Sequence, residues 1–324
     1  MSDTIRIGFI GCGGNARGHM NTLNNMEGAS VVAVCDVIEK NANEAAERTG
    51  GDPYIDLHEM LSRDDLDGIY LSLPVHAHGA PELAVIERGL PFFVEKPVAR
   101  RMEIAQEILK GVTEKNLITC VGYQLRYSGA SVAASELLQD QRVGLVVGKY
   151  WSGSGRGNPD AWIRQYEKSG GQILEQATHT IDAMRQLCGE VKEVITHRAS
   201  RELTEIDCPD VQAITLVFES GAIGSLTTSW AFDPRDWSNA NVLEITFADR
   251  LIRWGGGKSI TLSGGGEDKQ EVEGEGRSID AVFVDAVRSN DGSEIRSPYA
   301  DAVKSLELCL AINESGETGQ PVKL

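Results

Sequence analysis

The chain has no surplus of basic residues and no long apolar run. Its 31 lysines and arginines are outnumbered by 48 aspartates and glutamates, which leaves a net charge of −17. Nucleic acids and anionic membrane surfaces bind basic patches, so this charge balance argues against both as partners. A membrane-spanning helix requires a run of ~18 or more apolar residues, which the sequence does not contain.

The sequence also lacks closely spaced cysteines and an N-terminal targeting segment. None of its six cysteines forms a C-x-x-C pair, which argues against a disulfide framework and favours a reducing compartment. The first residues lead directly into a glycine-rich turn, without the apolar stretch and cleavage site of a signal peptide. We therefore expect a soluble cytoplasmic protein.

The order of strand-like and helical stretches divides the 324 residues in two. Up to residue 123, short β-branched stretches alternate with amphipathic helical ones. This alternation predicts a doubly wound α/β domain with a parallel sheet at residues 1–123. Beyond it, strands follow one another directly, and two helices, Ile279–Arg288 and Ala300–Asn313, close the chain. We expect an α+β domain at residues 124–324, with a large, open, mostly antiparallel sheet.

A glycine-rich turn follows the first predicted strand, Ile5–Ile10. The turn fits the pattern G-x-G-x-x-G/A with the residues Gly11, Cys12, Gly13, Gly14, Asn15 and Ala16. The first glycine permits a tight turn, the second lets the main chain approach a pyrophosphate, and the alanine allows close packing of the next helix. Glycines also cluster in ordinary turns, but the strand before and the helix after this turn indicate a dinucleotide-binding unit.

An acidic residue, Asp36, ends the next predicted strand about 20 residues after the turn. At this spacing a carboxylate binds the adenine ribose of a dinucleotide. Asp36 is followed by Val37 and Ile38, and not by a lysine or arginine that would bind a 2′-phosphate. The pattern therefore favours NAD over NADP.

A lysine, Lys96, follows a very apolar predicted strand, Pro91–Val94, and precedes Pro97. Proline disfavours helical geometry at the residue before it, so Lys96 should remain extended at the end of the strand. A solvated surface lysine is the common alternative. However, ligands of doubly wound sheets collect at the carboxyl ends of the strands, where Lys96 and the glycine turn would both lie.

A predicted helix, Gln172–Leu187, carries Glu175, His179 and Asp182 at positions i, i+4 and i+7. In an α-helix these positions share one face. A structural histidine is one interpretation, but three ionisable groups in line favour a functional site. A zinc site would need a further histidine or cysteine ligand, so we expect no metal.

Three of these motifs, in this order, resemble the Gfo/Idh/MocA family, named after glucose–fructose oxidoreductase, inositol dehydrogenase and a rhizopine catabolism protein. They are the glycine turn, the sequence Glu95-Lys96-Pro97, and residues 169–179, which match G-G-G-x3-D-x3-H/Y with Ser169 for a glycine and Glu175 for the aspartate. Residues 73–78 match the family's T-P-N-x-x-H segment loosely, with the histidine at His78.

The resemblance spans essentially the whole chain and implies a function. It implies an enzyme with an N-terminal Rossmann domain that transfers a hydride between a secondary alcohol of a sugar, cyclitol or related polyol and NAD. His179 would be the general acid/base, oriented by Glu175, and Lys96 would polarise the substrate oxygen. Asp182 would support the site.

The resemblance also implies which other residues meet the ligands. Besides the glycine turn and Asp36, cofactor contacts are expected from Leu73, Pro74, His78, Glu95, Lys96 and Gln124. Substrate contacts are expected from Lys96, Tyr123, Arg126, Trp162, Arg164, Glu175 and His179. Arg126, Arg156 and Arg164 could instead accept an acidic group of the substrate, and the sequence leaves neutral and acidic substrates open.

Two other functions occur on the same fold, and the sequence leaves both open. One is redox-neutral glycoside cleavage, in which NAD oxidises the sugar transiently before elimination. The other is a non-catalytic dinucleotide sensor, which would need neither Lys96 nor His179. The resemblance further implies a homodimer or homotetramer formed through the second domain's sheet, for which Trp230, Phe232 and Trp237 are candidate contacts.

Overall fold

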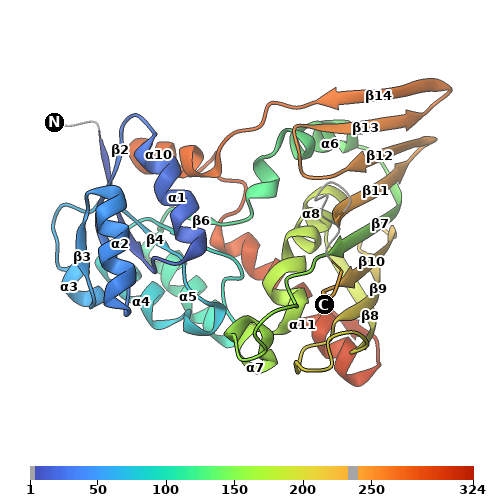
Figure 1. Cartoon of the computed structure of the whole chain (residues 1–324). Coiled ribbons are helices and arrows are strands. Elements are labelled where there is room, and N and C mark those ends of the chain that lie inside the picture. The colour runs from blue at the N-terminus through green and yellow to red at the C-terminus, as the bar shows by residue number, and fades with distance from the viewer. Residues whose placement is uncertain (1–3, 233–239) are drawn as a thin grey trace. The chain divides into compact units, whose positions relative to one another are not determined.

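The computed structural model describes residues 4–232 and 240–324. The chain forms two compact units, Met1–Gly122 with Ser278–Val303 and Tyr123–Arg277 with Lys304–Leu324 (Figure 1). The sequence-based division placed everything after residue 123 in one domain, whereas the structure returns residues 278–303 to the first unit. Within the described part of the chain, no helix combines the length and the apolar character needed to cross a bilayer.

The first unit is built on a six-stranded parallel sheet in the order β3-β2-β1-β4-β5-β6. Its strands are β1 (Ile5–Ile10), β2 (Ala29–Cys35), β3 (Asp52–Tyr54), β4 (Gly68–Leu71), β5 (Phe92–Val94) and β6 (Thr119–Val121). This confirms the predicted doubly wound α/β fold. Strand β3 was not predicted, because this edge strand is three residues long and contains a proline.

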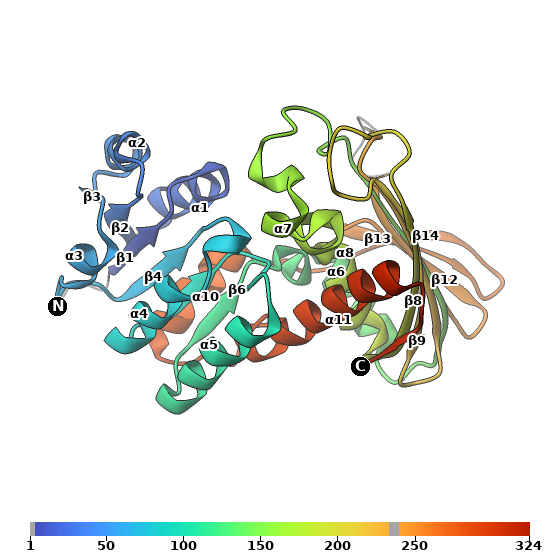
Figure 2. The same ribbon diagram turned by 90° about the horizontal axis from the view of Figure 1, so that it is seen from below.

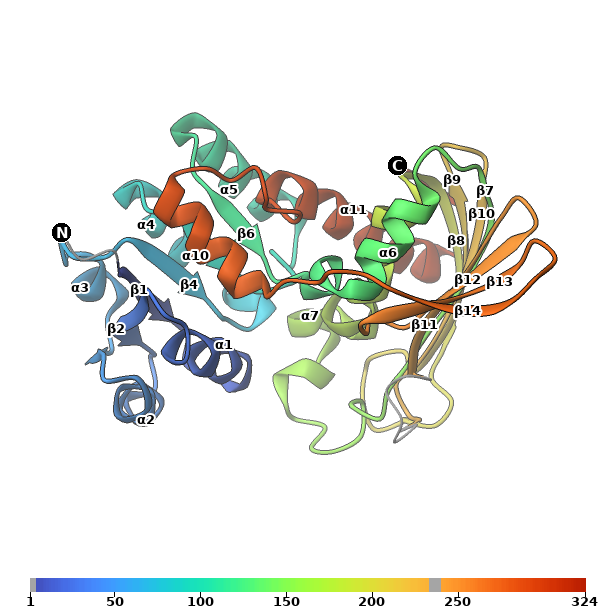
Figure 3. The same ribbon diagram turned by 90° about the horizontal axis from the view of Figure 1, so that it is seen from above.

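Helices cover both faces of this sheet (Figure 3). They are α1 (Gly14–Asn24), α2 (Glu39–Thr49), α3 (Leu57–Leu61), the 3₁₀ turn η1 (Val75–Ala77), α4 (Ala80–Arg88), α5 (Met102–Lys115) and α10 (Ile279–Ser289). Helix α1 packs against α2 and α10, and α4 packs against α3 and α5. The Phe283 ring of α10 lies 5.4 Å from that of Tyr70 and 6.0 Å from that of Phe93. This aromatic packing ties α10 to the sheet of the first unit, and hydrogen bonds of Ser297 and Tyr299 with β6 tie the residues that follow.

The second unit is built on a nine-stranded sheet in the order β14-β13-β12-β11-β7-β10-β9-β8-β15. Its strands are β7 (Val143–Trp151), β8 (Val191–Ala199), β9 (Val211–Phe218), β10 (Ile223–Ser229), β11 (Asn241–Phe247), β12 (Arg250–Trp254), β13 (Ser259–Gly264), β14 (Glu267–Glu273) and β15 (Val322–Lys323). Only β7 and β10 pair in parallel among these strands. The predicted, mostly antiparallel sheet is confirmed.

Helical segments cover one face of this second sheet (Figure 2). They are η2 (Gln124–Tyr127), α6 (Gly129–Leu138), η3 (Trp162–Arg164), α7 (Tyr166–Ser169), η4 (Ile173–Ala177), α8 (Thr178–Cys188) and α11 (Tyr299–Thr318). Helix α8 lies on β7 and β11. The helix predicted at Gln172–Leu187 is thus a π-helical turn, η4, followed by the α-helix α8.

The covered face of the sheet changes from apolar to polar along its strands. One cross-strand row, formed by Ile214, Leu226, Gly148 and Leu243, is apolar and buried. The row two residues away consists of Gln212, Thr228, Tyr150 and Asn241, each at most 6% exposed. Within the described residues, Gln212 Oε1, Thr228 Oγ1 and Asn241 Nδ2 have no hydrogen-bond partner. Such a row is unusual in a packed core, because an unpaired buried polar atom costs free energy.

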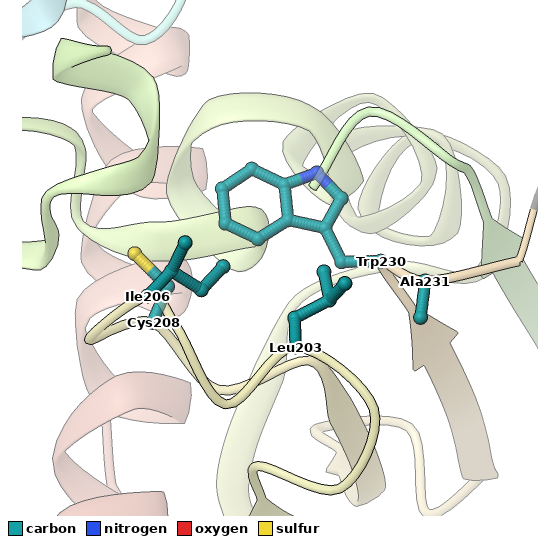
Figure 4. Packing of buried hydrophobic residues seen from close by; sticks show 5 residues of the cluster. All are labelled: Leu203, Ile206, Cys208, Trp230 and Ala231. Carbon is teal, nitrogen blue, oxygen red and sulfur yellow. The ribbon is translucent and has the colours of Figure 1, made fainter. Parts of the chain in front are cut away.

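A small core forms around Trp230 at the end of β10 (Figure 4). Leu203, Ile206 and Cys208 of the loop between β8 and β9 pack on the indole, which is fully buried. The indole Nε1 donates to Gln176 Oε1 at 2.8 Å. Trp230 therefore contributes to the interior of the unit and not to the outer face of the sheet, where the sequence had suggested it.

Replacing Thr228 by valine should stabilise the protein. The valine keeps the shape of the side chain and removes a buried hydroxyl that has no partner among the described residues. We expect the free energy of unfolding to rise by about 1 kcal/mol. Thermal unfolding of Thr228→Val and of the neighbouring Thr227→Val, whose side chain is exposed, provides the measurement and its control. A loss of stability in Thr228→Val alone would contradict this interpretation.

Candidate functional site

The glycine turn leaves an open space at the start of α1. Gly11 has φ +90°, and a Cβ at this position would lie 2.2 Å from the carbonyl oxygen of Ser72, so only glycine fits. A Cβ at Gly13 or Gly14 would meet nothing within 4 Å. Gly13 is the N-cap of α1, and the N-terminus of a helix offers amide donors and partial positive charge to a phosphate. These residues therefore fit the pyrophosphate of a dinucleotide.

Other residues of this turn serve packing. The thiol of Cys12 is buried and donates to the carbonyl oxygen of Cys35 at 3.5 Å. Burial raises the pKa of this thiol to about 12, so it stays protonated. Ala16 is buried where α1 meets the sheet, and Asn15 is exposed.

The carboxylate of Asp36 is fixed at the end of β2. Its Oδ2 accepts the main-chain amide of Cys12 at 2.9 Å, and its Oδ1 accepts that of Ile38 at 2.8 Å. Oδ2 also accepts from Asn41 Nδ2 at 3.4 Å, whereas Oδ1 keeps a further lone pair with which to accept a ribose hydroxyl. Val37 beside it is 89% exposed, and the first basic residue after Asp36, Lys40, pairs with Glu44 at 3.7 Å. This arrangement fits NAD, which carries no 2′-phosphate.

Lys96 lies two residues after the last residue of β5, near the strand end as the sequence predicted, and is half-buried. Its main-chain amide donates to Glu95 Oε2 at 3.1 Å, and the Lys96–Pro97 peptide bond is cis. The Glu95 side chain is buried, and a Cβ at Gly122 would come within 2.9 Å of its Oε2. Glu95 therefore holds the main chain at Lys96.

The segment after β4 contributes to the same edge of the sheet. A side chain at Gly11 would also approach Leu73 Cδ2, at 3.0 Å, so Leu73 lies beside the glycine turn, with Pro74 half-exposed next to it. His78 is turned into the protein: its Nδ1 lies 2.6 Å from Glu82 Oε1, and both side chains are fully buried. His78 therefore stabilises this segment and does not point out of it.

Sequence reasoning missed a histidine in the first unit. His19 of α1 lies between two carboxylates, with its Nε2 2.8 Å from Glu95 Oε1 and its Nδ1 2.6 Å from Asp280 Oδ1. Tyr70 Oη also donates to Asp280 Oδ1, at 3.1 Å. One signal could have revealed it: His19 lies on the helix face that Ala16 and Met20 bury, where a polar residue needs a partner.

The second unit contains the candidate acid/base pair. Glu175 lies in the π-helical turn η4 and is buried, whereas His179 lies in the first turn of α8 and is half-buried. Burial and the nearby Glu175 charge both raise the pKa of Tyr150, which places Glu175 close to the polar row on β7. The Tyr123 ring meets the His179 ring edge-on at 6.2 Å between centroids.

Asp182 and Arg126 form a buried ion pair. The guanidinium Nε and Nη2 donate to the two carboxylate oxygens at 2.8 and 2.6 Å, and Ser305 Oγ adds a third donor at 2.6 Å. Arg126 is 5% and Asp182 1% exposed. Two of the Arg126 donors that sequence reasoning assigned to the substrate are thus used by Asp182, whereas Gln124, in the same turn, is exposed.

Arg164 binds the glycine-rich loop that precedes it. Its guanidinium donates to the carbonyl oxygens of Gly155 at 2.8 Å, Ser154 at 2.9 Å and Asn158 at 3.2 Å, and to that of Arg156. Trp162, in the same 3₁₀ turn, is half-buried. Arg164 therefore shapes the loop.

Comparison with known proteins identifies both halves of the chain. Residues 5–123 match the family described as "Oxidoreductase family, NAD-binding Rossmann fold", and residues 132–249 match the "GFO/IDH/MocA C-terminal domain". The chain is 25% identical over 237 residues to 4-carboxy-2-hydroxymuconate-6-semialdehyde dehydrogenase of Sphingobium sp., which covers 71% of this chain and 73% of that protein. It is also 25% identical over 237 residues to inositol 2-dehydrogenase of Rubrobacter xylanophilus, which covers 70% of this chain and 65% of that protein.

Solved structures show the same fold. Levoglucosan dehydrogenase, solved in complex with NADH and levoglucosan, has a TM-score of 0.86 at 20% identity and covers 99% of each chain. At this identity the likeness establishes the fold alone. Because the two family matches together cover most of the sequence, the chain belongs to the Gfo/Idh/MocA family of NAD-binding oxidoreductases.

Proposed function

We propose that this protein oxidises a secondary alcohol of a neutral sugar, cyclitol or related polyol. The observation that carries the proposal is the occurrence of Lys96 just after β5, at the same edge of the parallel sheet as the glycine turn, in a chain that also carries the pair Glu175 and His179. When bound, NAD supplies the hydride acceptor. The substrate carbon loses its hydrogen as hydride while the oxygen loses its proton, so the chain must provide a base and a stabiliser of negative charge.

His179 is the base in this proposal. An imidazole with an ordinary pKa near 6.5 accepts a proton efficiently around neutral pH. Glu175, about one turn earlier, fixes the orientation of the ring and stabilises the imidazolium that forms. Lys96 donates a hydrogen bond to the substrate oxygen and stabilises the charge that develops there. In the reverse direction His179 returns the proton.

The contacts of the three candidate arginines favour a neutral substrate. Asp182 binds the guanidinium of Arg126, and main-chain carbonyl oxygens bind that of Arg164. Arg156 Nε donates to the carbonyl oxygen of Ala231 at 2.7 Å. In contrast, the polar row near Glu175 consists of uncharged amide and hydroxyl groups, the types that recognise hydroxyls. The names of the two relatives include a substrate with a carboxyl group and one without, so the preference for a neutral substrate rests on these contacts.

A panel of substrates tests the reaction. Neutral polyols, among them inositols, hexoses and anhydrosugars, are compared with the matching uronic acids, and NADH formation is recorded. We expect net NADH formation with at least one neutral polyol and a higher kcat/KM for it than for its acid. Cleavage of glycosides without net NADH would establish the redox-neutral alternative, and NAD binding without any turnover would establish the sensor.

The cofactor preference follows from the end of β2. With Asp36 held by two main-chain amides and Val37 exposed beside it, a 2′-phosphate would face a carboxylate and no free cation of residues 37–40. We expect kcat/KM to be at least ~10-fold higher with NAD than with NADP, since each 1.4 kcal/mol of repulsion is worth a factor of ten. An Asp36→Ser variant should narrow this ratio, and a wild-type preference for NADP would contradict the assignment.

Substitution of the proposed reacting groups should affect turnover and leave cofactor binding intact. We expect Lys96→Ala and His179→Ala each to lower kcat by ~10²-fold or more, the effect of losing a positioned proton-transfer group. Glu175→Gln should have a smaller effect and shift the limb of the pH–rate profile that belongs to His179. The exposed Lys110→Ala and His58→Ala serve as controls. Near-normal turnover of His179→Ala would contradict the role of general base.

We also infer that two copies associate through the uncovered face of the second sheet. Leu145, Val147 and Ile223 lie on the neighbouring strands β7 and β10, where Leu145 pairs with Ile223, and each is more than 40% exposed. Phe232 is 51% exposed and contacts the Trp151 ring at 6.0 Å. Trp237, the third candidate contact, lies outside the described residues.

The molar mass of the protein in solution tests this association of two copies. We expect a dimer or tetramer by light scattering at micromolar concentration, and a monomer for Val147→Glu, because a carboxylate in the apolar contact would be desolvated. Ile55→Glu, at an exposed apolar position of the first unit, is the matched control. A monomeric wild-type protein would refute the association.

A further inference from the structure

The imidazole of His19 lies within the first unit, apart from the groups that react in the proposed function. It connects α1, which begins at the glycine turn, with Glu95 at the end of β5 and with Asp280 in the first turn of α10. The rings of Phe93 and Tyr70 lie 4.8 and 5.5 Å from it. His19 is therefore a polar group with short contacts inside an aromatic core.

The contacts of His19 determine its charge. An ionised carboxylate only accepts hydrogen bonds, and a neutral imidazole has one N–H to donate. Each ring nitrogen of His19 lies within 2.8 Å of a carboxyl oxygen. With both carboxyl groups ionised, both nitrogens carry protons, and the ring is an imidazolium. Burial alone would lower the pKa of His19, but the hydrogen bonds and charges of Asp280 and Glu95 outweigh it and raise the pKa to about 10.

The carboxylate of Glu95 transmits this contact to Lys96. One oxygen of Glu95 accepts from His19, and the other accepts from the main-chain amide of Lys96 at 3.1 Å. The end of β6 closes the remaining space, since a Cβ at Gly122 would lie 2.9 Å from Glu95 Oε2. While the imidazolium is present, these contacts restrict the Glu95 side chain to one position.

We propose that His19 is a positioning residue for the reaction: its imidazolium, clamped between Asp280 and Glu95, fixes the main chain from which Lys96 reaches the substrate oxygen. The proposal rests on the role of Lys96 in the proposed function. It ties the position of Lys96 to the helix whose N-terminus receives the pyrophosphate. The groups that face His19 are Asp280 from α10, Glu95 from the end of β5 and Tyr70 from β4.

The kinetic test compares His19→Gln and Asp280→Asn with the wild-type enzyme. We expect His19→Gln to lower kcat by ~10-fold or more, because small displacements of a positioning group are costly to turnover. KM and the Kd for NAD should stay within about threefold, since the amides of the glycine turn are unchanged. The kcat of Asp280→Asn should lie between the values of His19→Gln and the wild-type enzyme. The exposed His58→Gln is the matched control and should behave as wild type.

Hydrogen exchange of the Lys96 amide tests the positioning without any turnover. This amide donates to Glu95, so it should exchange at least ~10-fold faster in His19→Gln, as expected for a locally loosened hydrogen bond. The Gly122 amide, which donates to the carbonyl oxygen of Val94 at 2.9 Å, should keep its rate. If no substrate of the panel is turned over, the proposed function fails and this measurement still decides the role of His19.

The pH dependence of stability provides an independent readout of the charge. Because folding raises the pKa of His19 from 6.5 to about 10, the clamp's contribution to stability is complete below pH 6.5 and is lost as pH rises through 10. The difference in Tm between wild type and His19→Gln should therefore shrink over this interval. The ¹⁵N shifts of His19 should show both nitrogens protonated at about pH 8, where an unperturbed histidine is neutral.

Two outcomes would overturn the proposal. One is a kcat of His19→Gln within about twofold of the wild-type value together with an unchanged Lys96 exchange rate; a lowered Tm beside these results would reduce the clamp to a stabilising contact. The other is a His19 that titrates near its ordinary pKa of 6.5, since a neutral ring cannot donate to both carboxylates.

Discussion

Main-chain hydrogen bonds across the ends of the parallel strands hold the dinucleotide-binding edge of the first unit together. The first amide after β1, β4, β5 and β6 donates to the carbonyl oxygen of the last residue of a neighbouring strand, at 2.8 to 2.9 Å, in the pairs Gly11 to Cys35, Ser72 to Ile10, Glu95 to Leu71 and Gly122 to Val94. The turns that carry functional side chains therefore start from fixed positions. The glycine turn and Lys96 share one edge because their strands run in parallel in one sheet.

Cations with little exposure to solvent are held by carboxylates within each unit of this acidic protein. His19 lies between Glu95 and Asp280 in the first unit, and Arg126 is bound by Asp182 in the second. Removing both charges of such a pair from water costs free energy that their attraction does not always recover, so their value lies in geometry more than in stability. Each pair fixes the orientation of an element that also carries a proposed functional residue, Lys96 in one unit and His179 in the other.

The π-helical turn η4 changes the directions in which Glu175, His179 and Asp182 face relative to one another. In a continuous α-helix, all three would face one way. The wider turn at Ile173–Ala177 precedes α8, and the contacts differ accordingly: Glu175 lies near Tyr150, and Asp182 binds Arg126. Turns of this kind occur often at functional sites.

The sequence by itself determined both sheets, the glycine turn and the position of Lys96 at a strand end. These features depend on local patterns: the alternation of strands and helices, the conformational freedom of Gly11 and the effect of Pro97. Local patterns also located Asp36, whose carboxylate is held by the adjacent chain.

Contacts between distant segments decided the rest. Helix α10 reads like any amphipathic helix, and its contacts assign it to the first unit, among them the packing of Phe283 on Tyr70 and Phe93 and the pairing of Asp280 with His19. Trp230 follows a strand whose alternate residues are exposed, and only the loop folded over it makes it part of a core. Arginine and histidine side chains bind whichever acceptor the fold brings near, and the partners of Arg126 and His19 lie 56 to 261 residues away. No local pattern specifies a partner at that distance, so their roles appear only in the folded chain.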